Sequence, residues 1–195
     1  RWLPDDLGAR HVLVNQASYR VNVIEQGKLI WDSNVIVGKP LTQTAVFSDT
    51  FETVVYNPTW GVPQSIILNE YLPKSRANPG YLDKIGFKVI QANGKVVSSR
   101  SVNWNSIGAN SGIGIMQPAG GSNALGEIKF LFPNSHSIYM HDTPNRELFK
   151  ESKRNFSHGC VRVENPREFA EVLLELDRGT IDAEIDGGES KTVKV

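Results

Sequence analysis

The only cysteine of the chain, Cys160, lies two residues after a histidine in the segment Ser157-His158-Gly159-Cys160-Val161-Arg162. A thiol near its reference pKa of about 8.5 is mostly protonated at neutral pH, so a nucleophilic cysteine needs a base or a cation beside it. His141, which we expect at the end of a strand, is the candidate base. These residue types are those of covalent catalysis by a thiol.

Two neighbours of the cysteine fit the same chemistry. Gly159 permits a tight turn that bares backbone amides toward a reacting carbonyl, as an oxyanion hole requires. If the segment is extended, Arg162 projects to the same face as Cys160. Its guanidinium could there bind a substrate carboxylate or a carboxylate of the fold. An internal salt bridge explains Arg162 equally well.

Two other interpretations of the cysteine stay open. Free cysteine is among the most buried residue types, so Cys160 could simply be a small core residue. Zinc binding is the other alternative, because His136, His141 and His158 lie near the cysteine in the sequence. Their separations match none of the familiar zinc spacings, however. We therefore expect no metal and no cofactor.

Length and charge bound the class of protein. A chain of 195 residues is long enough for one domain with a real hydrophobic core. Lys and Arg total 21 and so do Asp and Glu, so no net charge draws the protein to nucleic acid or to an anionic membrane. No apolar run approaches the roughly 20 residues that span a bilayer. We expect one monomeric domain, residues 1–195, without a nucleic-acid partner.

Short β-rich segments dominate the first third of the chain and recur after residue 127. They predict strands at residues 11–15, 19–24, 29–31, 35–38, 53–56, 87–90, 95–97, 128–132 and 137–140. Pro and Gly punctuate residues 69–110, which we interpret as an insertion that could cover a site. Residues 105–126, rich in Gly, Ser and Asn, predict a long ordered loop. The predicted fold class is mainly β, of the α+β type.

One long helix is predicted directly after the cysteine segment. Asn165 can cap it, Pro166 suits its first turn, and Glu168 completes a capping-box-like pair with the cap. Gly179 is expected to end it, and residues 186–191 to form a turn before a last short strand. One apolar stripe is expected to face the core: Phe169, Val172, Leu173 and Leu176.

The spacing of the two central residues resembles a family signature. His141 is followed, after fifteen residues, by the Ser-His-Gly-Cys-Val-Arg segment, which resembles the signature of the L,D-transpeptidases, the YkuD-type catalytic domain that remodels peptidoglycan. Residues 138–144, 123–130, 57–60 and 79–82 resemble the larger periplasmic branch of that family. The resemblance covers most of residues 10 to 180. It implies a β-sandwich or barrel domain with a capping insertion, which agrees with the interpretation of residues 69–110.

The resemblance implies cysteine acyl transfer on peptidoglycan stem peptides. Cys160 would attack the carbonyl of the third stem residue, typically a diaminopimelate, and the terminal D-Ala would leave. His141 would take the thiol proton and pass it to the leaving amine, or would already be an imidazolium paired with a thiolate. The backbone amides of Gly159 and Cys160 would hold the oxyanion. An amine of a neighbouring stem would capture the acyl-enzyme and form a cross-link between third residues.

Other residues are assigned supporting roles. The backbone carbonyl of Asp142 is expected to orient the catalytic imidazole as the third member of a triad. His158 and Ser157 are expected to position the loop and the substrate. Tyr139 and Trp60 are expected to line the donor groove, although aromatic residues at strand ends are more often part of the core.

Two alternative functions use the same segment. Water as the acceptor would make the protein a carboxypeptidase, and a degenerate site would leave a non-catalytic module that binds the cell wall. Carbapenems are expected to be covalent inhibitors, because they present a strained acyl group to the cysteine of this family. We expect the protein in the bacterial periplasm or cell envelope. Since the first residue is not Met, any targeting segment is expected outside this sequence.

Overall fold

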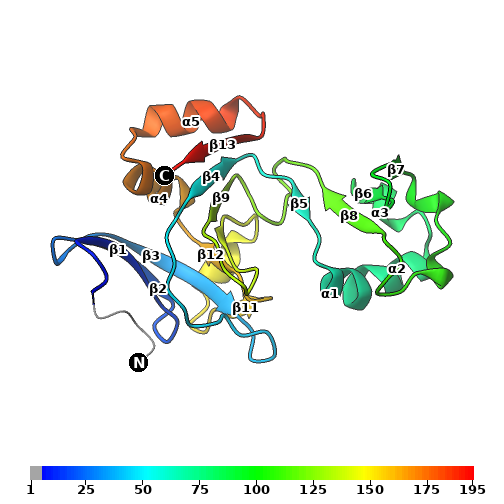
Figure 1. The fold of residues 1–195 in the computed structure, drawn as a ribbon, viewed down its shortest axis with the longest axis horizontal. Coiled ribbons are helices and arrows are strands. Elements are labelled where there is room, and N and C mark those ends of the chain that lie inside the picture. Colours follow the sequence, from blue (N-terminus) through cyan, green and yellow to red (C-terminus); the bar gives the residue numbers. More distant parts are fainter. Residues whose placement is uncertain (1–5) are drawn as a thin grey trace. The chain divides into compact units, whose positions relative to one another are not determined.

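The computed structural model describes residues 6–195 (Figure 1). The chain divides into two compact units. The first unit combines Arg1–Pro58 with Gly120–Val195, and the second is Thr59–Ala119. Among the described residues, no helix combines the length and the apolar character needed to cross a membrane.

The strands of the first unit form one nine-stranded mixed sheet. They are β1 (Arg10–Asn15), β2 (Arg20–Glu25), β3 (Lys28–Gly38), β4 (Thr53–Tyr56), β9 (Ile128–Leu131), β10 (Met140–His141), β11 (Asn155–Ser157), β12 (Val161–Val163) and β13 (Lys191–Lys194). Their order is β1-β2-β3-β12-β10-β9-β4-β13, with β11 beside β3. Only β10 with β12 and β11 with β3 pair in parallel within this described sheet. The expected sheet-rich α+β class is confirmed.

Alternation of apolar and polar residues explains β2 and β9, β-rich composition explains β1 and β4, and pairing explains the differences from the prediction. The predicted strands 29–31 and 35–38 are one strand, β3, because Asp32 and Ser33 continue the pairing with β2. The predicted strand 137–140 begins only at Met140, where pairing with both β9 and β12 starts. The last short strand, β13, is present as predicted and pairs with β4.

The core of the first unit lies on one face of the sheet and contains Phe169. Phe169 lies on helix α4 (Pro166–Leu174) and is fully buried. Its ring centroid lies 4.6 Å from that of Phe130 on β9 and 5.2 Å from that of Trp31 on β3. Burying one such side chain contributes about 1.5–3 kcal/mol. The helix that follows the cysteine segment is thereby fixed to the central strands.

The prediction of a single principal helix is wrong. Helix α4 ends at Leu174, where Glu175 adopts a left-handed conformation with φ of 55°, and not near Gly179. A second helix of equal length, α5 (Arg178–Asp186), contains Gly179. The Asp177 side chain caps it by accepting from the backbone N–H of Thr180 at 3.0 Å. Its buried side chains, four residues apart, are Ile181 and Ile185.

The start of α4 also differs in detail. Asn165 stands at the cap position, but its side chain makes no capping hydrogen bond. Its Nδ2 atom donates instead to the Ser33 hydroxyl at 3.3 Å. Glu168 accepts from the indole nitrogen of Trp31 at 3.2 Å rather than completing a capping box. Both side chains therefore tie the helix to β3.

The second unit has its own sheet and core. Its strands are β5 (Trp60–Gly61), β6 (Lys88–Ile90), β7 (Val96–Val97) and β8 (Gly114–Gln117), in the order β5-β8-β6-β7. Its helical elements are α1 (Gln64–Ile66), η1 (Ile67–Tyr71), α2 (Leu72–Ala77), α3 (Tyr81–Lys84), η2 (Ser99–Ser101) and η3 (Trp104–Ser106). The predicted insertion, residues 69–110, lies inside this unit. Its capping role stays a prediction.

Two predictions made for this region have definite outcomes. The hairpin at Asn93-Gly94 is confirmed: β6 and β7 pair, and Gly94 takes the positive φ of 80° that the turn requires. The long loop predicted at residues 105–126 is wrong for residues 114–117, which form β8. Cross-strand pairing of β8 with β5 and β6 outweighs the low strand propensity of that Gly-rich sequence.

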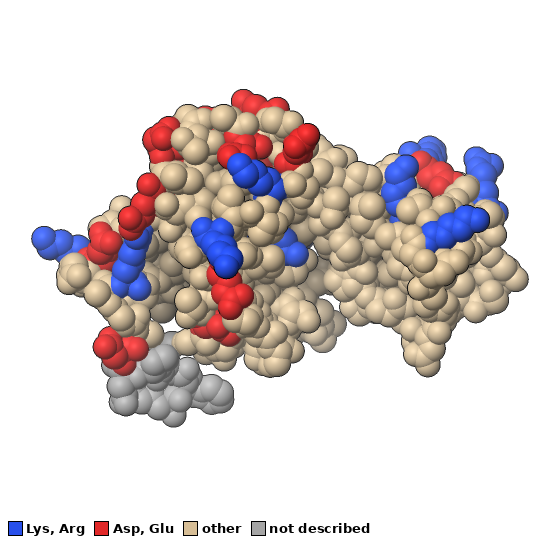
Figure 2. Space-filling model, turned by 45° about the horizontal axis from the view of Figure 1, so that its top comes forward, with Lys and Arg blue, Asp and Glu red and all other residues tan. Residues whose placement is uncertain are grey.

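Charge is distributed unequally between the two units. Residues 59–119 contain six Lys or Arg and two Asp or Glu, so the balanced total of the chain hides a basic second unit and an acidic remainder. Figure 2 shows basic and acidic groups side by side over the first unit, whereas the second unit shows mostly basic ones.

Candidate active site

Pairing of the central strands places three polar side chains in one row. His141 on β10 pairs with Lys129 on β9 and with Arg162 on β12. Paired residues share a face of the sheet, and successive residues alternate between faces. The neighbours Met140, Phe130 and Val161 belong to the buried core. The row Lys129, His141 and Arg162 therefore lies on the face opposite the core.

Cys160 and Tyr139 join the same face. The backbone N–H of Val161 donates to the carbonyl of Tyr139 at 3.1 Å, which brings the residues before β10 and β12 together. Cys160 is two residues before Arg162, and the buried Val161 between them points into the core. The Tyr139 ring centroid lies 5.6 Å from that of His141. Thiol, imidazole and cation are thus neighbours on one surface.

The His141 imidazole is held in one tautomer. Its Nδ1 atom donates a hydrogen bond to the backbone carbonyl of Asp142. A carbonyl can only accept, so Nδ1 carries the proton and Nε2 is left as the basic nitrogen. His141 is 5 % exposed. Burial, with the positive charges of Arg162 and Lys129, lowers the pKa of His141 to about 3. At neutral pH the imidazole is a neutral base.

The Cys160 thiol is also neutral in this arrangement. The side chain is half-buried, and burial raises the pKa of the thiol above its ordinary value, although Tyr139, Lys129 and Arg162 act in the opposite direction. The sulfur donates to the carbonyl of Ser137 at 3.9 Å. Of the two resting states expected from the sequence, the structure favours a neutral thiol and a neutral imidazole over a thiolate–imidazolium pair.

Side-chain hydrogen bonds build the turn before Cys160. Ser157 is buried, and its hydroxyl donates to the Cys160 carbonyl while accepting from the Gly159 N–H at 3.1 Å. The Thr44 hydroxyl donates to the Gly159 carbonyl at 2.8 Å. Gly159 has a φ of 121°, a conformation that other residues rarely adopt. Because the Gly159 amide is already engaged, its predicted part in an oxyanion hole requires this hydrogen bond to break.

The Asp142 side chain has a structural task that the sequence did not indicate. It is 4 % exposed, and its Oδ2 atom accepts from the Glu127 N–H at 2.9 Å. Its Oδ1 atom lies 3.3 Å from the Arg146 guanidinium. A Cβ atom on Gly126 would lie 2.1 Å from Oδ2, so only glycine fits beneath the carboxylate. Burial raises the pKa of Asp142.

The remaining predicted residues lie in different surroundings. His158 is exposed in the turn before the cysteine. Tyr139 lies beneath the ammonium group of Lys129, which is 4.1 Å from its ring centroid. Trp60 belongs to the second unit, where its ring centroid lies 6.4 Å from that of Phe87. The roles assigned to these residues stay predictions.

Three residues of the candidate site were not assigned a role from the sequence: Lys129, Thr44 and Gly126. One signal for Lys129 was present: it stands between Ile128 and Phe130, so a single strand carries a cation on the face opposite its apolar side chains. The contacts of Thr44 with Gly159 and of Gly126 with Asp142 join residues distant in the sequence, and no local pattern marks them.

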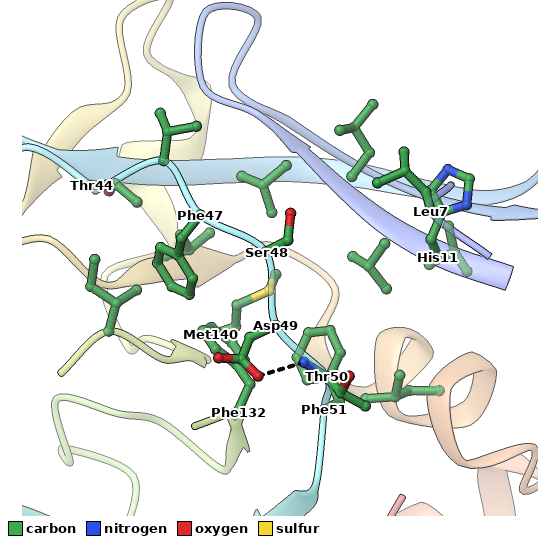
Figure 3. A pocket seen from close by; sticks show the side chains of 18 of the residues that line it. Leu7, His11, Thr44, Phe47, Ser48, Asp49, Thr50, Phe51, Phe132 and Met140 are labelled. Carbon is green, nitrogen blue, oxygen red and sulfur yellow. Dashed lines mark hydrogen bonds between the residues drawn. The ribbon is translucent and has the colours of Figure 1, made fainter. Parts of the chain in front are cut away.

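A cavity of about 640 Å³ in the first unit lies on the other side of the sheet. Its lining includes Met140 and Val161, which alternate with the residues of the polar row. Figure 3 shows Phe47, Phe51 and Phe132 around it. The candidate site is therefore the polar face, and this mainly apolar cavity is separate from it.

The described part of the chain offers no set of side chains that could bind zinc. Residues 6–195 hold no group of three or more His, Cys, Asp or Glu side chains placed to bind a metal ion. His136 packs its ring against Phe47, with centroids 5.1 Å apart. The Nδ1 atom of His141 is committed to a backbone carbonyl.

Known proteins resemble this chain in sequence and more weakly in structure. The sequence model of YkuD, the L,D-transpeptidase catalytic domain, matches residues 9–190. A Haemophilus influenzae protein described as "Putative L,D-transpeptidase" is 40% identical over 164 residues, covering 84% of this chain and 33% of that protein. The chain thus spans about a third of the length of this curated relative.

Two solved structures give the scale of the structural likeness. An L,D-transpeptidase from Mycobacterium smegmatis has a TM-score of 0.41 at 12% identity, over 84% of this chain and 52% of that one. A mutant L,D-transpeptidase of Enterococcus faecium has a TM-score of 0.39 at 13% identity, over 89% and 48%.

Proposed function

Because the chain belongs to the L,D-transpeptidase (YkuD) catalytic-domain family, we propose that it joins peptidoglycan stem peptides through a thioester on Cys160. The donor is a tetrapeptide stem that loses its terminal D-Ala, and the acceptor is an amine on a neighbouring stem. The observation that carries the proposal is the placement of His141 and Cys160 on one face of the sheet, with Nδ1 of His141 committed to a carbonyl and Nε2 left as the basic nitrogen.

The first half-reaction forms the acyl-enzyme. The Cys160 sulfur attacks the carbonyl of the third stem residue while Nε2 of His141 takes the thiol proton. The carbon–nitrogen bond to D-Ala then breaks, and His141 gives the proton to the leaving amine. D-Ala departs with a neutral imidazole restored. A lowered thiol pKa is not needed, because the base acts during the attack.

The second half-reaction reverses these proton movements. The acceptor amine attacks the thioester carbonyl and loses a proton to His141. The carbon–sulfur bond breaks, and the proton returns to the sulfur. The product is a cross-link between two third residues, with the thiol and the imidazole unchanged.

The oxyanion of each tetrahedral intermediate needs a donor near Cys160. The Gly159 amide faces Ser157 in the free protein, so the Cys160 amide is the donor that needs no rearrangement. Rotation of the Ser157 hydroxyl would release the second amide. Loss of one such donor typically costs about a hundredfold or more in rate.

The cellular setting and the monomeric state are part of the same proposal. We place the reaction in the bacterial periplasm or cell envelope, where the stem peptides are, and treat the protein as a monomer. The insertion predicted at residues 69–110 would control access of the stems. Carbapenems would acylate Cys160 and add one covalent mass to the wild type but none to Cys160→Ala.

Product analysis by mass spectrometry tests the proposed function. The wild type and Cys160→Ala are incubated side by side with disaccharide-tetrapeptide. Cross-linked dimer plus free D-Ala from the wild type alone is the expected result. Disaccharide-tripeptide without dimer would replace the transpeptidase by a carboxypeptidase, since only the acceptor differs. Absence of both products would contradict the proposal.

A further inference from the structure

Lys129 and Arg162 lie beside His141 and Cys160 and have no counter-ion among residues 6–195. Lys129 and Arg162 flank His141 in the row described above. The Nε atom of Arg162 is buried and has no hydrogen-bond partner. Among residues 6–195, neither side chain forms an ion pair with a carboxylate, whereas Arg167 of the same unit pairs with Glu127 and Asp182. This cluster is positively charged and uncompensated.

Such an arrangement is costly unless an anion binds it. Removing a cation from water without a partner costs several kcal/mol, and buried charges in proteins are therefore usually paired. Burial lowers the pKa of both Lys129 and Arg162, which reflects that cost. The neutral Cys160 and His141 offer no compensating charge. An anionic group of the substrate is the partner that this surface fits.

We propose that Lys129 and Arg162 together bind the carboxylate on the carbon next to the amine that leaves or enters the reaction. The inference rests on the proposed function. In the donor this group is the terminal carboxylate of D-Ala, one carbon from the scissile nitrogen. The distal amine of a diaminopimelate acceptor carries a carboxylate in the same relation. Leaving and entering amines occupy the same place, so one pair of cations serves both half-reactions.

The two side chains are suited to this task in different ways. The guanidinium of Arg162 is a planar fork that matches both oxygens of a carboxylate. The ammonium of Lys129 is a point charge, held over the Tyr139 ring by a cation–π contact that leaves its hydrogens able to donate. Both flank His141, whose Nε2 must reach the amine nitrogen next to that carboxylate.

The inference predicts a strict chemical preference. A donor with a free terminal carboxylate should react faster than the same stem ending in D-alaninamide. A charge-assisted pair of this kind typically changes affinity or rate by about 10- to 100-fold. A free D-amino acid should likewise capture the acyl-enzyme better than its amide.

Measuring each enzyme variant with both the acid and the amide substrate tests the roles of Lys129 and Arg162 directly. The rate constant kcat/KM is measured for tetrapeptide and tetrapeptide amide with the wild type, Lys129→Gln, Arg162→Gln and the conservative variant Arg162→Lys. Lys194→Gln, an exposed lysine on β13 of the same unit, is the matched control. The acid-to-amide ratio should be about 10 or more in the wild type and in Lys194→Gln. It should fall toward 1 in both Gln variants and recover partly in Arg162→Lys.

The outcomes separate this inference from the proposed function. Equal wild-type turnover of acid and amide would overturn the inference while leaving the transpeptidase intact. Variants that slow both substrates by the same factor would also overturn it, because the cations would then act on the thiol. A wild type that cleaves neither substrate, releasing neither D-Ala nor D-alaninamide, would overturn the proposed function and the inference with it. Thermal unfolding of each variant shows that the ratios refer to folded protein.

Discussion

The Nδ1 atom of His141 donates its hydrogen bond to the backbone carbonyl of Asp142, the next residue in the chain. Orientation of the imidazole thus comes from the backbone and not from a carboxylate side chain. The Asp142 carboxylate binds the Glu127 amide instead and fixes the peptide that carries the acceptor carbonyl. The proposed general base and the group that orients it are therefore two adjacent residues.

Replacing the base should separate thiol chemistry from catalysis. In His141→Gln the acylation rate of Cys160 by disaccharide-tetrapeptide should fall by about 10²- to 10⁴-fold, the usual contribution of a general base. Alkylation by iodoacetamide at high pH should persist, because the thiol itself is unchanged. Rapid-quench mass spectrometry measures both rates. His136→Gln, an exposed histidine of the same unit, should behave as the wild type, and equal losses in the two variants would contradict the assigned role.

Gly126 should be irreplaceable for steric reasons. Gly126→Ala places a Cβ atom 2.1 Å from the Asp142 carboxylate and puts alanine at a φ of 61°. The free energy of unfolding should fall by about 1–3 kcal/mol, and acylation should slow because the His141 support moves. Urea unfolding measures the first effect. Gly121→Ala, in the same segment with nothing within 4 Å and no positive φ, should change stability by at most about 0.5 kcal/mol.

The sequence predicted those strands and helix ends whose own residues favour them. Strands β1 and β4 follow from their β-rich residues, β2 and β9 follow from alternation, and the start of α4 follows from Pro166 and its apolar stripe. Gly179 misled the prediction because a capping Asp177 and two buried isoleucines outweigh the low helix propensity of one glycine. Strand β8 lies in a Gly-, Ser- and Asn-rich segment and is paired on both sides, with β5 and with β6.

The site was predictable to the extent that the candidate nucleophile and the residues of its turn share one short segment. Cys160, Gly159 and Ser157 are neighbours in sequence, so their types alone indicate a nucleophile in a tight turn. Lys129 enters the site through the register between β9 and β10, and register is fixed by pairing across the sheet. The resting protonation state also depends on burial, which the sequence does not reveal.

Ser157 should contribute to both stability and rate. Its buried hydroxyl bonds the Gly159 N–H and the Cys160 carbonyl. Ser157→Ala leaves both backbone groups without this partner, so the free energy of unfolding should fall by about 1–3 kcal/mol. Chemical denaturation of this variant beside Ser135→Ala, an exposed serine, measures the effect. A change equal to that of the control would show that the turn does not depend on the hydroxyl.

The buried neutral imidazole should make stability depend on pH. The pKa of His141 is lowered to about 3, against about 6.5 in an unfolded chain, so between these values the unfolded state binds more protons. The contribution of the neutral His141 to the free energy of unfolding is complete above pH 6.5. It is lost as the pH falls toward 3, at up to about 1.4 kcal/mol per pH unit. The difference in unfolding free energy between the wild type and His141→Gln, measured from pH 7 to pH 4, should follow this slope. A difference that stays constant would mean that the imidazole is not buried in its neutral form.

The proposed mechanism requires that Cys160 carries the acyl group during turnover. The most direct measurement is acid quenching of the wild type during reaction with disaccharide-tetrapeptide, followed by mass spectrometry of the protein and of its peptides. We expect one added disaccharide-tripeptide acyl group, located on the peptide that contains Cys160, and no addition to Cys160→Ala. An acyl group on any other residue, or cross-linked product from Cys160→Ala at the wild-type rate, would contradict it.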